Sequence, residues 1–233
     1  MMCRRRGLQS AVCAAILLFS MGCGSGEPGR VPTSAGPPSV APLERATRPR
    51  IVVLGDSLTA GLGLRPDEAY PSILQQRLDA RGLAYEIVNA GVSGDTSAGG
   101  LRRLEWSLAG DVRVLIVALG GNDALRGLPA TELRSNLESI IKQALAKKIT
   151  VVLAGMEAPP NFGRVYTDGF RNVYTSLAKE YRVALVPFLL QGVAGVESMN
   201  QADGIHPTAE GARIAADNVW TVLAPMLRVQ RPT

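Results

Sequence analysis

Short apolar runs alternate along the chain with longer segments in which apolar residues return every three or four positions. Five of the runs have the length of a strand, are rich in valine and isoleucine, and do not alternate with polar residues; they lie at residues 51–54, 85–88, 114–119, 150–153 and 183–186. Such runs are typical of strands that are buried on both faces of a parallel sheet. We therefore expect a parallel sheet of about five strands.

The segments between these runs have the period of amphipathic helices. The clearest, residues 131–148, has apolar side chains on one face at spacings of three and four, namely Leu133, Leu137, Ile140, Ile141, Ala144 and Leu145. Shorter segments at residues 73–78 and 101–108 follow the same rule. The last segment is predicted to run from Pro207 to about residue 223, because an early helical turn tolerates proline and Pro225 then ends the helix.

Alternating strands and helices predict an α/β fold, a three-layer α/β/α sandwich of the flavodoxin-like type. In such folds ligands bind beyond the carboxyl ends of the parallel strands. Polar motifs follow four of the predicted strands, and they are Asp56-Ser57, Ser93-Gly94-Asp95, Gly121-Asn122-Asp123 and Asp203 with His206. We expect these motifs, which are distant in sequence, to meet at one edge of the sheet.

His206 is the only histidine of the chain. Since histidine alone has an unperturbed pKa near neutrality, any chemistry that needs an imidazole must use this residue. Asp203 precedes it by three positions and can reach one ring nitrogen, which would turn the other nitrogen toward Ser57. A serine at a strand end, a histidine and an aspartate are the components of a nucleophilic hydrolase.

Each motif also has a purely structural interpretation. Ser57, Asn122 and Asp203 could each cap a helix, as these residue types often do after a strand. Gly94 could be an ordinary turn glycine. In the catalytic interpretation, the backbone N–H groups of Ser57 and Gly94 and the side-chain amide of Asn122 would donate to an oxyanion. Asp123 would then orient its loop rather than react.

The four blocks together resemble the SGNH, or GDSL, hydrolase family, which has them in this order: Gly55-Asp56-Ser57-Leu58, Gly94, Gly121-Asn122-Asp123 and Asp203-Gly204-Ile205-His206-Pro207. The resemblance covers essentially all of residues 50–228. It implies no cofactor and no metal. The resemblance implies that Ser57 is the nucleophile, that His206 is the general base and that Asp203 orients His206. It implies oxyanion donors at Ser57, Gly94 and Asn122. It implies supporting carboxylates at Asp56 and Asp123.

More narrowly, residues 94–97, 119–123, 125–127 and 159–163 are similar to a bacterial branch of arylesterases and periplasmic thioesterase/lysophospholipase enzymes. This similarity implies a serine esterase for short-to-medium acyl esters, aryl esters or lysophospholipids. An acyl-CoA thioesterase would use the same chemistry, so that alternative stays open. A polysaccharide deacetylase is a further alternative. A non-catalytic envelope-binding lipoprotein would be expected to lack Ser57, Asn122 or His206, and this chain keeps all three.

The first residues of the chain differ from the rest. Arg4-Arg5-Arg6 precede an apolar stretch at residues 8–21, the pattern of a secretory signal peptide over residues 1–23. Cys23 follows a small residue there, which resembles a bacterial lipoprotein signal and implies a lipid anchor on Cys23; ordinary signal cleavage is the alternative.

Residues 24–49 contain six of the chain's 15 prolines and predict a disordered linker to a domain at 50–228. We expect an exported protein on the periplasmic side of a bacterial membrane.

Charge and composition narrow the possible partners. The formal net charge is +5, but residues 1–49 hold six arginines and two acids, which leaves 19 basic and 18 acidic side chains in residues 50–233. A surface for nucleic acid needs clustered positive charge, and the sequence of residues 50–233 shows no such cluster. The three cysteines all lie within residues 1–23, and with one histidine a zinc site would consist almost wholly of carboxylates, which is unusual. The oligomeric state is left open.

Overall fold

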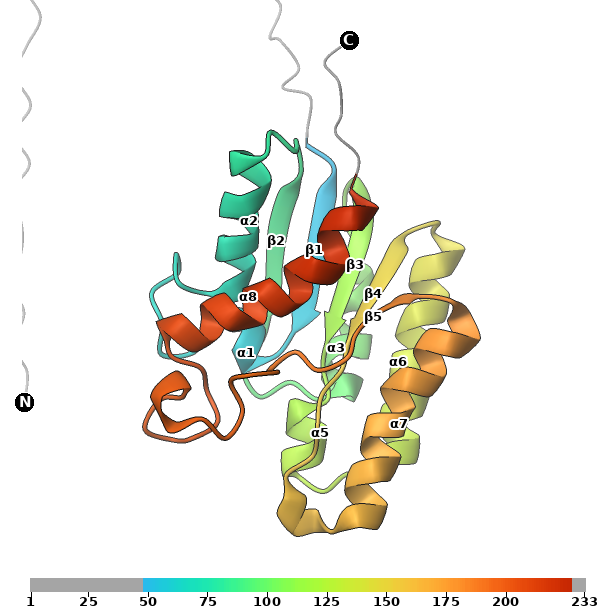
Figure 1. Cartoon of the computed structure of the whole chain (residues 1–233). Coiled ribbons are helices and arrows are strands. Elements are labelled where there is room, and N and C mark those ends of the chain that lie inside the picture. Colours follow the sequence, from blue (N-terminus) through green and yellow to red (C-terminus); the bar gives the residue numbers. More distant parts are fainter. Residues whose placement is uncertain (1–47, 228–233) are drawn as a thin grey trace, which may run out of the picture. The chain divides into compact units, whose positions relative to one another are not determined.

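The computed structural model describes residues 48–227 of the 233-residue chain (Figure 1). The predicted signal peptide, most of the predicted linker and the predicted lipidation site at Cys23 lie outside the described residues. Among residues 48–227, no helix is both long enough and apolar enough to cross a membrane.

A five-stranded parallel sheet forms the centre of the domain, in the strand order β2-β1-β3-β4-β5. The prediction of a parallel sheet of about five strands is therefore confirmed. Each strand lies within a few residues of its predicted position, and the bounds are β1 Arg50–Gly55, β2 Glu86–Gly91, β3 Val112–Ala118, β4 Thr150–Ala154 and β5 Ala184–Val186. The inner strands β1, β3 and β4 are almost wholly buried, as their unbroken apolar runs predict.

Helices cover both faces of the sheet and complete the predicted three-layer sandwich (Figure 1). On one face α2 packs against α8, and on the other α6 packs against both α3 and α7. The α-helices are α1 Ser57–Ala60, α2 Tyr70–Ala80, α3 Ser97–Arg102, α4 Leu104–Ser107, α5 Gly121–Leu125, α6 Ala130–Ala146, α7 Arg164–Tyr181 and α8 Ala209–Leu223. Three short 3₁₀ helices are η1 Pro160–Phe162, η2 Glu197–Met199 and η3 Ala224–Met226.

Two helix predictions need correction. The segment 101–108 forms two short helices, α3 and α4, with a break at Arg103. The last helix does not begin at Pro207: it begins at Ala209, and the Thr208 hydroxyl caps it by accepting from the N–H of Gly211. Pro207 instead pairs with Asn200 in an isolated antiparallel bridge, so that it closes the loop before α8. The sequence permitted an early-turn proline but did not require one.

The helix α7 was not singled out from the sequence, although its spacing could have revealed it. Its buried face consists of Phe170, Val173, Tyr174 and Leu177, at spacings of three and four. The rings of Phe170 and Tyr174 lie 5.9 Å apart and stack with a tilt. This aromatic pair gives the apolar stripe of α7 a different composition from the leucine and isoleucine stripe of α6.

Truncation of a central core side chain should destabilise the whole domain. Ile116 in β3 is fully buried between β1 and β4. We expect Ile116→Ala to lower the free energy of unfolding by about 2–5 kcal/mol, because it removes buried apolar surface and leaves a cavity. Urea denaturation measures this change. Val165→Ala, at a side chain that is 94% exposed, is the control and should change it by less than about 0.5 kcal/mol.

Candidate active site

The four polar motifs meet at the carboxyl edge of the sheet, as predicted. Asp56 and Ser57 follow β1, Gly94 follows β2, and Asn122 follows β3. His206 lies in the long connection that runs from β5 to α8. These residues line one cleft, to which all four motifs contribute.

A chain of hydrogen bonds joins Ser57, His206 and Asp203. The Nε2 atom of His206 lies 2.8 Å from the Ser57 hydroxyl oxygen, and its Nδ1 atom lies 2.6 Å from Oδ2 of Asp203. An ionised carboxylate can only accept, so Nδ1–H donates to Asp203 and Nε2 is left to accept from the serine hydroxyl. Both distances fall within the range that proton transfer requires.

Asp203 is ionised in this arrangement, and its side chain is partly exposed to water. The N–H groups of His206 and Ile205 both donate to its Oδ1 atom at 3.0 Å. The backbone N–H of His206, followed by the His206 side chain and the N–H of Ile205, lowers the pKa of Asp203 to about 2. The loop thus supplies a fixed negative charge beside the imidazole.

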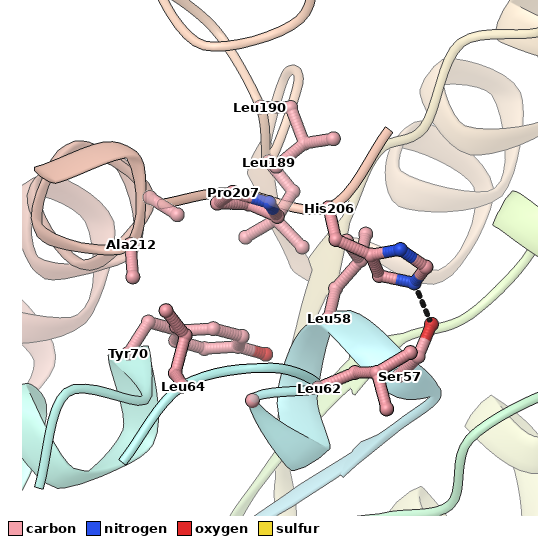
Figure 2. A pocket seen from close by; sticks show the side chains of 12 residues that line it. Ser57, Leu58, Leu62, Leu64, Tyr70, Leu189, Leu190, His206, Pro207 and Ala212 are labelled. Carbon is pink, nitrogen blue, oxygen red and sulfur yellow. Dashed lines mark hydrogen bonds between the residues drawn. The ribbon is translucent and has the colours of Figure 1, made fainter. Parts of the chain in front are cut away.

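Behind the Ser57–His206 pair lies a small apolar cavity of about 10 Å³, which has room for roughly one water molecule (Figure 2). Its other walls are mainly leucine, alanine and proline side chains, among them Leu58, Leu189, Leu190, Pro207 and Ala212. Figure 2 shows the imidazole of His206 directed to the serine hydroxyl beside this apolar wall.

Three candidate oxyanion donors border the same cleft as Ser57 and His206. Within residues 48–227, the backbone N–H groups of Ser57 and Gly94 donate to no other protein group, and both residues line the cleft. Gly94 has φ +84°, a conformation that favours glycine, and a Cβ there would face open space with only Arg126 within 4 Å. The side-chain amide of Asn122 donates one hydrogen to Asp56, at a distance of 3.3 Å between Nδ2 and Oδ2. Its second amide hydrogen is available to a substrate oxygen.

Asp56 is almost completely buried beneath these donors, with 2% of its surface exposed. Its carboxylate accepts from the N–H of Leu58 at 3.0 Å and from Nδ2 of Asn122. Burial raises the pKa of Asp56 from 3.8 to about 6, while the bonds from Leu58 and Asn122 lower it by less. Asp56 thus holds the asparagine amide in place at neutral pH, when it is ionised.

Asp123 is also buried, and it fixes the loop that carries Asn122. Its carboxylate accepts from the N–H and the hydroxyl of Ser97, at 2.8 Å and 2.5 Å. Asn136 in α6 in turn donates to the Ser97 hydroxyl. Asp123 therefore joins the segment that follows β3 to the start of α3.

Arg103 is a site-supporting residue that sequence reasoning missed. Its guanidinium donates to Asp95 at 2.6 Å, and to the carbonyls of Ala90 and Gly55 at 2.7 Å each. It therefore joins the end of β1, the end of β2 and the turn that contains Gly94. In the sequence it stands on the polar side of a leucine-spaced segment, which indicates a solvated arginine, and no local signal distinguishes it.

The cleft has a volume of about 560 Å³, the size of a small-molecule binding site. Apart from the polar groups above, most of its lining is apolar, and includes Leu58, Leu62, Leu125, Met156, Pro159, Phe188, Leu190 and Ile205. Two segments supply much of this lining, residues 156–160 after β4 and several residues between positions 188 and 200 after β5. In the part of the chain that the structure describes, no three His, Cys, Asp or Glu residues are grouped so as to hold a metal ion.

Comparison with known proteins gives consistent matches. Residues 53–214 match the GDSL-like Lipase/Acylhydrolase family. The chain is 45% identical to the esterase TesA of Pseudomonas aeruginosa over 185 residues. The aligned region covers 79% of this chain and 92% of that protein. It is 35% identical over 178 residues to thioesterase 1/protease 1/lysophospholipase L1 of Escherichia coli K12, with 76% and 84% covered. A crystal structure of TesA superposes with a TM-score of 0.74 at 45% identity, over 76% of this chain and 99% of that chain.

The raised pKa of Asp56 should make the effect of Asp56→Asn depend on pH. Between about pH 4 and pH 6 the folded protein holds the Asp56 proton and the unfolded chain releases it, so the free energy of unfolding falls as the pH rises. Asparagine does not titrate, so the free energy of unfolding of Asp56→Asn does not fall with pH through this group. Its free energy of unfolding relative to the parent should therefore increase by about 2 kcal/mol from pH 4 to pH 7.

Denaturant unfolding of both proteins at several pH values measures this difference. Asp168→Asn, at an exposed position in α7, is the matched control. A difference between Asp56→Asn and the parent that does not change with pH would contradict the prediction.

Proposed function

The chain belongs to the GDSL-like lipase/acylhydrolase family and is a serine-type carboxylic ester hydrolase, and we propose that Ser57, His206 and Asp203 perform its reaction. The observation that carries this proposal is the hydrogen-bonded series from the Ser57 hydroxyl through the imidazole to an ionised Asp203, open to a cleft of substrate size. The names of the two relatives described above, an esterase and a thioesterase/lysophospholipase, support the same reaction class.

In the proposed first step, Nε2 of His206 removes the proton from Ser57 while the serine oxygen attacks the ester carbonyl. Asp203 stabilises the imidazolium that forms. His206 then gives the proton to the leaving alcohol, and an acyl-enzyme on Ser57 remains. In the second half-reaction His206 removes a proton from water and the hydroxide attacks the acyl-enzyme. His206 then returns the proton to the Ser57 oxygen as the carboxylic acid leaves.

The negative charge on the tetrahedral oxygen would be held by the N–H groups of Ser57 and Gly94 and by the amide of Asn122. Several contacts support this assignment: Asp56 orients the amide, while Arg103 and Arg126 brace the turn of Gly94. Donors that are fixed before the reaction stabilise the transition state without having to reorganise.

The substrate class follows from the cleft. Its apolar lining suits an acyl chain or an aryl group, and we propose short-to-medium acyl esters, aryl esters or lysophospholipids as substrates. An acyl-CoA thioester is the second candidate, because the acyl-enzyme chemistry is the same and one relative is named a thioesterase.

We further propose that residues 1–23 export the protein and that Cys23 carries a lipid anchor. The support is the basic and apolar pattern before Cys23 in the sequence. Residues 24–49 would then hold the hydrolase domain away from a periplasmic membrane surface.

The proposal is tested by hydrolysis of p-nitrophenyl butyrate by a soluble form that begins at Arg45. The parent should turn over, Ser57→Ala should have essentially no activity, and Asn122→Ala should lose about 10²–10³ in kcat through one missing oxyanion donor. Circular dichroism establishes that each variant is folded. A folded Ser57→Ala protein with parental activity would overturn the assignment of the nucleophile.

Acyl length provides a separate test of the cleft. Each methylene that enters the apolar lining contributes about 0.8 kcal/mol, so kcat/KM should rise about fourfold per added carbon from p-nitrophenyl acetate to hexanoate. Steady-state rates for the ester series measure this slope. A kcat/KM that does not rise along the series would show that the acyl chain does not bind in the apolar cleft.

A further inference from the structure

Ser57 and His206 must be held at hydrogen-bond distance although they stand 149 positions apart in the chain. Ser57 lies at the start of α1, directly after the sheet. His206 lies in the loop between η2 and α8, where the only strand-like pairing is the isolated bridge between Asn200 and Pro207. Some contact other than the sheet has to set the position of this loop relative to α1.

Gln201 makes such a contact. Its side-chain Nε2 donates to the carbonyl of Leu62 at 2.7 Å and to that of Pro207 at 2.9 Å. Its backbone N–H donates to the carbonyl of His206 at 2.7 Å, and its own carbonyl accepts from Gly204. One half-buried residue thus closes the loop around His206 and attaches it to a distant segment.

The attachment point is directly connected to Ser57. The N–H of Leu62 donates to the carbonyl of Ser57 at 3.1 Å, in the turn that ends α1. Among the hydrogen bonds of residues 48–227, the Gln201–Leu62 bond is the only one besides Ser57–His206 that joins residues 56–64 to residues 200–208. A short covalent and hydrogen-bonded path therefore runs from Ser57 through Leu62 and Gln201 to His206.

The turn after α1 is shaped to receive this glutamine. Gly63 has φ +77°, and a Cβ built there would lie 2.1 Å from Oε1 of Gln201. Only a residue without a side chain lets the amide lie this close to the chain. Both amide hydrogens of Gln201 point to carbonyl oxygens, so the opposite orientation of the amide would place oxygen against oxygen.

We propose that Gln201 is a positioning residue that sets the Ser57–His206 geometry by bonding the histidine loop to the turn after α1. This inference rests on the proposed serine mechanism. It assigns to Gln201 no contact with substrate. Its effect should therefore appear in the rate of acyl-enzyme formation rather than in the binding of the ester, because a small displacement of a catalytic base lowers the rate steeply.

The test compares Gln201→Met, which keeps the size of the side chain but removes both donors, with Gln191→Met, an exposed glutamine of the same connecting region. Steady-state kinetics with p-nitrophenyl butyrate should give a kcat reduced by about 10- to 100-fold in Gln201→Met, with KM changed less than about twofold. Gln191→Met should match the parent. The second-order rate at which an ethyl phosphonate ester labels Ser57 should fall in parallel with kcat.

Gly63→Ala displaces the same amide from the opposite side, and it provides the test if Gln201→Met does not fold. The two substitutions should be strongly non-additive in the double variant, because each breaks the same contact. Thermal unfolding separates a loss of folded protein from a loss of rate. An active parent with unchanged kcat and labelling rate in folded Gln201→Met would overturn this inference alone, whereas an inactive parent would overturn the proposed function itself.

Discussion

The parallel pairing of the five strands is the constraint on which the rest of this structure depends. Because all five strands run in one direction, every strand-to-helix connection with a polar motif emerges at the same edge of the sheet. Four motifs spread over 150 residues of sequence meet there, two in short helices (α1 and α5) and two in loops. The inner strands β1, β3 and β4 are buried on both faces, so the register that places Ser57 beside the ends of β2 and β3 is held by the core.

Beyond that edge, the site is held together by buried or partly buried polar groups, each with partners. Asp56, Asp123 and Arg103 connect adjacent strand ends to the loops that follow them. A buried charge without partners would be strongly unfavourable, so each of these groups stabilises one arrangement of its loop over others. For Asp56 the arrangement has a cost, since burial raises the pKa of a carboxyl that orients Asn122 when ionised. Catalytic geometry and fold stability are therefore coupled through the same side chains.

The sequence predicted the sheet well and the supporting contacts poorly, for reasons that particular residues make clear. The apolar runs of β1, β3 and β4 have one physical explanation, burial on both faces, and were placed within a few residues. Pro207 was assigned to a helix because proline is compatible with a first turn, but the bridge with Asn200 determines its conformation. Arg103 was missed because its partners are Asp95 and two carbonyls from other strands, which no local pattern reveals.

By itself the sequence determined the fold class, the edge of the sheet at which the polar motifs meet, and the candidate residues Ser57, Gly94, Asn122, Asp203 and His206. The fold class and the edge follow from properties that are local in the chain, namely hydrophobic period, residue type and position after a strand, and the set of candidate residues follows from these together with the resemblance of the four blocks to the SGNH family. Only the tertiary structure decided the 2.8 Å contact between Ser57 and His206, the burial that shifts the pKa of Asp56, and the attachment of the histidine loop through Gln201. Those properties depend on distances between segments far apart in sequence, and such distances are set by the packing of the whole domain.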